Sequence, residues 1–206
     1  MNPATLHLYL AAEDLPGLAV GRKLVEEHRP RLAVNREENG GGFGTLRRKT
    51  PNFDQMASRG YPVLLLTDLD ADPCPSSKIA AWLGRTPNPR FLLRICVREV
   101  EAWLLADPAA IAGFLGIPPR LVPQNPESLM NPKAKLIELA QRAPRRIRAG
   151  LTPSGRAGIG PEYNELLVGF VANHWSIARA AERAPSLQSA RRRLAEMAMA
   201  PPPGFH

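Results

Sequence analysis

The stretch PVLLLTDLDADP, residues 62–73, decides the fold of this chain. Its apolar run, Val63 to Leu66, is typical of a strand that is buried on both faces of a parallel sheet. Three aspartates follow at alternate positions, Asp68, Asp70 and Asp72. Carboxylates this close repel one another unless a cation or a proton offsets their charge. The stretch therefore predicts a buried strand, and it raises the question of which cation accompanies its acidic end.

Around this stretch, strand patterns alternate with helical ones over roughly the first 115 residues. We expect strands at 6–11, 63–67 and 90–97. We expect helices at 13–28, 50–60, 75–84 and 98–116, the last interrupted at Pro108. Residues 35–49, which include the run NGGGFG, are expected to form a flexible loop. This alternation predicts an α/β fold, a mostly parallel Rossmann-like sheet flanked by helices.

The strand patterns stop near residue 117. A Pro-rich connection follows, and then helical patterns at 133–142, 162–173 and 186–199. We therefore expect an α/β core that carries the acidic site over 1–116, a basic helical extension packed on it over 117–200, and a disordered tail at 201–206.

Composition restricts where the protein works. The chain has 206 residues, of which 44% are hydrophobic, but no uncharged apolar run approaches the roughly 18 residues of a membrane span. The N-terminal residues lack the basic segment of a signal peptide. Cys74 and Cys96 form no CxxC motif and suggest a reducing compartment. We expect a cytoplasmic protein without membrane contact.

The net charge of +8 is unevenly distributed. Residues 1–130 hold 15 Lys and Arg against 14 Asp and Glu, whereas residues 131–206 hold 12 against 5. A cationic second part suits a nucleic-acid partner, although basic helices are as often simply solvated.

Acidic residues follow each of the three expected strands: Glu13 after the first, Asp68, Asp70 and Asp72 after the second, and Glu99 and Glu101 after the third. Ligands of open α/β sheets bind at the carboxyl ends of the strands. Carboxylates there are hard ligands suited to Mg²⁺ or Mn²⁺, which could activate water for phosphodiester cleavage. All six are candidate metal ligands. Singly, each has a plainer interpretation as a turn, capping or surface acid.

A glutamate after the first strand and a DxD after a later one resemble the TOPRIM domain of topoisomerases, primases and OLD-family nucleases. Four further segments, VREVEAWLLADP, NPKAKL, GPEYNELLVGFV and SLQSARRRL, are similar to a bacterial family of TOPRIM-like proteins. Its members are often encoded beside AAA or ABC-type ATPases in anti-phage defence loci. The resemblance spans roughly residues 5–195. One departure is that Asp14-Leu15-Pro16-Gly17 follows the glutamate instead of a Gly-rich turn.

The resemblance implies that Glu13 is a general acid/base or metal ligand and that Asp68 and Asp70 bind the metal and are catalytic. Basic residues of the second part are candidates for holding DNA or RNA: Lys133, Lys135, Arg145, Arg146 and Arg148. Each of these could instead be a solvated helix residue.

Three hypotheses follow. The first is a Mg²⁺-dependent phosphodiesterase, a nuclease of TOPRIM type that works with an ATPase. The second is a non-catalytic TOPRIM-like subunit that binds and regulates an ATPase. The third is a DxD-type phosphatase, against which the continuation Asp72-Pro73 counts.

Overall fold

The computed structural model describes residues 5–154 and 158–200. The tail expected at 201–206 lies outside the described residues. The described residues form two compact units. The first comprises those up to residue 95 and from residue 189 onward, and the second comprises those between 96 and 188.

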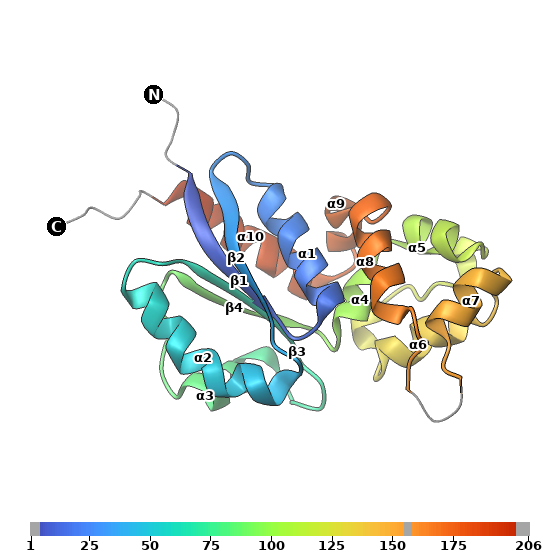
Figure 1. The fold of residues 1–206 in the computed structure, drawn as a ribbon, viewed down its shortest axis with the longest axis horizontal. Coiled ribbons are helices and arrows are strands. Elements are labelled where there is room, and N and C mark those ends of the chain that lie inside the picture. Colours follow the sequence, from blue (N-terminus) through green and yellow to red (C-terminus); the bar gives the residue numbers. More distant parts are fainter. Residues whose placement is uncertain (1–4, 155–157, 201–206) are drawn as a thin grey trace. The chain divides into compact units, whose positions relative to one another are not determined.

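A parallel sheet forms the centre of the first unit (Figure 1). Its strands are β1 (Leu6–Ala12), β2 (Leu32–Asn39), β3 (Val63–Asp68) and β4 (Phe91–Cys96), in the order β2-β1-β3-β4. The central strand β1 pairs in parallel with both β2 and β3. Every residue of β3 is buried, as its continuous apolar sequence predicts. The α/β fold class is thereby confirmed.

Helices cover both faces of this sheet (Figure 1). One face carries α1 (Leu15–Glu26), which comes close to the strands because Gly21 lies directly over Leu10. The other face carries α2 (Phe43–Ser58), whose Phe53 ring packs 5.7 Å from Tyr9 of β1. The helix α3 (Pro75–Leu83) follows the acidic turn and lies beside α2. Helix α10 (Pro185–Met199) returns to this unit, where Arg191 pairs with Glu27 at the end of α1.

The second unit is helical. Its helices are α4 (Val100–Leu105), α5 (Pro108–Leu115), α6 (Pro132–Ala140), α7 (Arg145–Leu151), α8 (Tyr163–Asn173) and α9 (Ile177–Ala181). Short 3-10 turns occupy Pro119–Leu121 and Pro126–Ser128. Two tryptophans organise the core, because the Trp175 ring nitrogen donates to the Trp103 carbonyl and the Trp103 ring nitrogen donates to Ser186.

The units divide at different positions from the boundary that we expected near residue 116. All six residues of α4 are buried, so this helix needs other helices around it and clusters with the second unit. At the other end, residues after 188 belong to the first unit. Within the described residues, no helix is long and apolar enough to cross a membrane.

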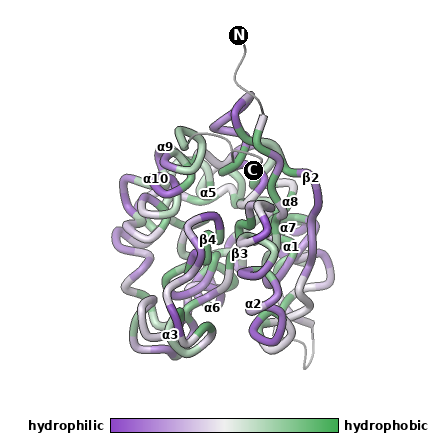
Figure 2. Tube along the Cα trace, turned by 90° about the vertical axis from the view of Figure 1, so that its left-hand side faces the viewer, coloured by the Kyte–Doolittle hydropathy of each residue, from purple (hydrophilic) through white to green (hydrophobic). Residues whose placement is uncertain are grey.

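The prediction of a flexible loop over residues 35–49 is wrong. The structure places β2 over its first part, and α2 begins at Phe43 and continues through Pro51. The sequence does not indicate this strand because β2 lies at the sheet edge, and five of its eight residues are Asn, Arg or Glu. Figure 2 shows β2 with largely hydrophilic colours.

Candidate functional site

The strands β1 and β3 bring Glu13 and Asp68 together at their carboxyl ends. Ala12 pairs with Leu66, so the next residues, Glu13 and Thr67, lie side by side. The Glu13 carboxylate accepts hydrogen bonds from the Thr67 hydroxyl at 2.8 Å and from the Asp68 backbone amide at 3.3 Å. These bonds fix the carboxylate beside the acidic turn. The sequence did not indicate Thr67 as part of the site.

Asp68 is the last residue of β3, and its side chain is largely enclosed, with 8% of the residue exposed. The chain then turns sharply, because Asp70 adopts a left-handed backbone conformation with φ of 53°. This conformation is more accessible to Asp than to most other residues. The turn directs the chain toward α3.

Lys78 of α3 provides a cation for two of the three aspartates. Its ammonium nitrogen lies 3.1 Å from a carboxylate oxygen of Asp70 and 3.1 Å from one of Asp72. It also lies 3.3 Å from the Leu69 carbonyl oxygen. Only 2% of Lys78 is exposed. The cation that offsets the charges of Asp70 and Asp72 is thus the Lys78 ammonium group, a side chain of the protein.

Aromatic rings enclose the same lysine. Its nitrogen lies 5.4 Å from the centre of the Trp82 ring and 5.8 Å from that of Phe43. Such contacts stabilise a cation that has lost water. The sequence does not distinguish Lys78, because a single lysine in an amphipathic helix is an ordinary pattern and only the tertiary fold shows what it contacts.

Glu99 and Glu101 belong to the second unit, where Lys133 contacts both. A Glu99 carboxylate oxygen accepts from the Lys133 backbone amide at 2.8 Å. Glu101 accepts from the Tyr163 hydroxyl at 2.8 Å and lies 3.5 Å from the Lys133 ammonium nitrogen. Burial raises the pKa of Glu101, which is fully enclosed, and Lys133 opposes that rise. Both acids therefore have structural partners inside their own unit.

The predicted nucleic-acid contacts divide into two kinds. Lys133 and Lys135 are engaged locally, the first with the acids just described and the second with Glu138 at 2.8 Å. The three arginines of α7 are exposed and form no ion pair with another described residue: Arg145, Arg146 and Arg148. Helix α7 therefore presents an unneutralised cationic surface, as a phosphate backbone would require.

A metal ion could be held by Glu13 and Asp68. Within residues 5–154 and 158–200, no three His, Cys, Asp or Glu side chains are grouped so that they could hold a metal. Mg²⁺, however, commonly uses one or two carboxylates and completes its shell with water and substrate phosphates. The adjacent Glu13 and Asp68 fit that smaller ligand set, whereas Asp70 and Asp72 already face Lys78.

Comparisons with known proteins add no family to this description. No family model matches the chain. No curated protein and no solved structure is significantly similar to it.

Proposed function

We propose that this chain is a metal-dependent phosphodiesterase, a nuclease of TOPRIM type, with its site at the carboxyl ends of β1 and β3. The observation that carries the proposal is the Glu13 carboxylate, fixed by Thr67 and by the Asp68 amide next to the Asp68 side chain. Paired carboxylates from adjacent strands suit phosphoryl chemistry. A nucleic-acid substrate and an ATPase partner are part of the proposal, and they rest on the resemblance and on the cationic α7.

In this proposal Glu13 and Asp68 would hold Mg²⁺ or Mn²⁺, which supplies Lewis-acid activation of water and of the phosphoryl group. The Thr67 hydroxyl and the Asp68 amide orient Glu13 by donating to one of its oxygens. Lys78 holds Asp70 and Asp72 in the turn and limits the negative charge near the site. The exposed arginines of α7 would contact the phosphate backbone.

Calorimetric titration with Mn²⁺ tests the metal site. We expect wild type to bind Mn²⁺ and Asp68→Asn and Glu13→Gln to lose binding, because each removes one of two charged ligands. Glu165→Gln, which neutralises an exposed acid of α8, is the matched control and should bind as wild type does. Cleavage of labelled DNA and RNA in Mn²⁺ should fall about 100-fold or more in both site variants. Cleavage that survives in Asp68→Asn would contradict the proposal.

Lys78 favours a second candidate, a non-catalytic subunit that binds a partner. A buried ammonium between Asp70 and Asp72 is what a structural acidic turn needs, with no metal required. Lys78→Met preserves the side-chain volume and removes the charge. If Glu13 and Asp68 form a metal site, wild type binds Mn²⁺, and the variant binds it at least as tightly because a nearby positive charge is gone. If the acids are only structural, wild type does not bind Mn²⁺.

A further inference from the structure

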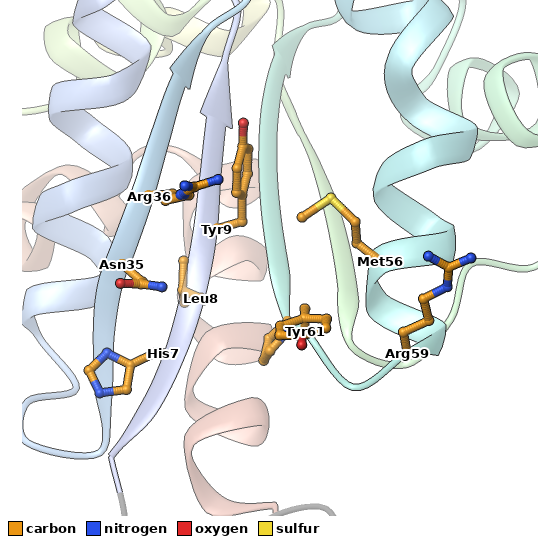
Figure 3. Close-up of a pocket in the computed structure, with 9 residues that line it drawn as sticks. His7, Leu8, Tyr9, Asn35, Arg36, Met56, Arg59 and Tyr61 are labelled. Atoms are coloured by element: carbon orange, nitrogen blue, oxygen red, sulfur yellow. The ribbon is translucent and has the colours of Figure 1, made fainter.

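A pocket of about 470 Å³ opens on the face of the sheet that carries α2, entirely within the first unit (Figure 3). Its polar and aromatic lining comes from β1, β2, the end of α2 and the turn before β3. The residues that matter to the argument are Tyr9, Asn35, Arg36, Met56, Arg59 and Tyr61. The volume lies in the range of small-molecule sites, roughly 300–1,000 Å³. None of these residues belongs to the acidic site.

A β-bulge builds the wall contributed by β2. Leu8 pairs with Val34, but Tyr9 pairs with Arg36, so Asn35 is an extra residue in the edge strand. Paired residues of parallel strands point to the same face, and the bulge therefore turns Arg36 toward the face of Tyr9. Continuing the earlier register would pair Arg36 with Leu10, on the face that α1 covers. The bulge is what supplies the pocket with an arginine.

Two tyrosines give the pocket its aromatic surfaces. Tyr9 is held rigidly, because its hydroxyl donates to Glu38 at 2.5 Å and its ring packs on Phe53. Tyr61 is 66% exposed and lies below Tyr9 and Met56 in Figure 3. Met56 extends from α2 toward the sheet between them. An exposed ring beside a polarisable thioether is well suited to stacking on a planar ligand.

Two arginines add charge to these surfaces. Arg36 and Arg59 are both exposed, and neither forms an ion pair with another described residue. In Figure 3 the Arg36 side chain extends toward Tyr9, while Arg59 stands at the end of α2. Guanidinium groups bind phosphate bidentately. Asn35 adds an amide of the kind that pairs with the edge of a base.

We propose that this pocket binds a nucleobase together with its phosphate, with the base stacked on Tyr61 and the phosphate held by Arg59, while Arg36 contacts the ligand from the opposite wall of the pocket. A purely apolar ligand would bury the arginines and Asn35 without partners, which is costly. A bare anion would make no use of the aromatic surfaces. The ligand is a segment of single-stranded nucleic acid or a free nucleotide, since both present this chemistry.

This inference does not depend on the proposed hydrolysis. Tyr9 precedes Glu13 by four residues along β1, which separates the pocket from the acidic turn by roughly 13 Å. Base binding can therefore be tested in a protein whose acidic site has been disabled, such as Asp68→Asn. Binding that persists there while cleavage is absent would separate the two claims.

The test is fluorescence anisotropy of the whole protein with a labelled single-stranded oligonucleotide of about ten residues, followed by titration with AMP and UMP. Stacking is worth about 1–3 kcal/mol per base, so Tyr61→Leu should weaken binding about tenfold, while Tyr61→Phe retains the ring and should bind within about twofold of wild type. Arg59→Gln should weaken binding about fivefold. Its matched control is Arg47→Gln, which removes the same charge from the exposed surface of α2, about 18 Å away along the helix.

The two probes distinguish the sources of the ligand. A mononucleotide that binds with the same ranking of variants identifies a free nucleotide, and binding confined to the oligonucleotide identifies a strand. Either result supports the proposal. Equal affinities for wild type, Tyr61→Leu and Arg59→Gln would overturn it, as would pyrophosphate binding as tightly as AMP. Failure of wild type to bind either probe at about 1 mM would also overturn it.

Discussion

At the scale of single residues, two lysines determine how the acids can act. Lys78 contacts Asp70 and Asp72 in the first unit, and Lys133 contacts Glu99 and Glu101 in the second. Each pair of acids therefore has an internal cation or donor. Glu13 differs, because the Thr67 hydroxyl and the Asp68 backbone amide orient its carboxylate without cancelling its charge.

Glu101 should make stability depend on pH. Burial raises its pKa in the folded protein, so folding favours the protonated form. Its stabilising contribution is complete below the unfolded pKa of about 4.3 and is lost as the pH rises through the folded value. Glu101→Gln is neutral throughout and still meets Tyr163. We expect urea unfolding to show the variant gaining stability relative to wild type as the pH rises above the unfolded pKa.

The exposed Glu165→Gln substitution provides the comparison for this experiment. Its stability relative to wild type should change little with pH, because the side chain is exposed and the substitution alters no buried group. If the difference in unfolding free energy between Glu101→Gln and wild type does not change with pH, burial does not raise the pKa of Glu101.

At the scale of elements, the second unit depends on a close crossing of the end of α7 and the segment that leads into α8. The Gly160 amide donates to the Leu151 carbonyl at 3.1 Å, and the Glu162 amide donates to the Gly150 carbonyl at 3.0 Å. A Cβ atom at Gly160 would lie 2.1 Å from the Gly150 oxygen. Backbone atoms cannot yield as a flexible side chain can, so only glycine permits this approach.

Gly160→Ala should therefore destabilise the protein by about 3 kcal/mol, through overpacking against the backbone of α7. Gly158→Ala is the matched control, because a Cβ atom there meets nothing within 4 Å. The measurement is the free energy of unfolding from denaturant titration of both variants. Equal stabilities of the two variants would show that the crossing relaxes without cost.

The elements also show what sequence patterns can and cannot predict. Val63 to Leu66 predict β3 because burial on both faces demands a continuous apolar run. The second half of β2 is polar because it lies at an edge, and its bulge at Asn35 also breaks any simple alternation. Glu13 lies beside Asp68 because β1 and β3 are neighbours in a parallel sheet. The sequence predicted such a sheet, with these acids at the ends of its strands. The role of Lys78 depends on tertiary packing alone.

At the scale of the whole molecule, the chain leaves the first unit after Ile95 and returns to it at Ser189. An amphipathic pattern predicted the last helix at 186–199, and the structure has α10 at Pro185–Met199. The pattern predicts a buried stripe but does not identify the surface that buries it. This is why the sequence assigned the last helix to an extension, whereas the structure assigns most of it to the first unit.

The returning part of α10 should stabilise the sheet even though it is the last part of the chain. Leu194 is fully buried within this part, so Leu194→Ala should cost about 2–5 kcal/mol through the cavity that it leaves. Native-state hydrogen exchange locates the loss. We expect faster exchange of the amides of β1 and β3 than in Arg192→Ala, a matched change at an exposed position of the same helix. The discontinuous first unit predicts this result, because residues 189–199 belong to the same compact unit as the strands. Exchange that accelerates only in α10 would instead mean that the helix opens alone and that the sheet is stable without it.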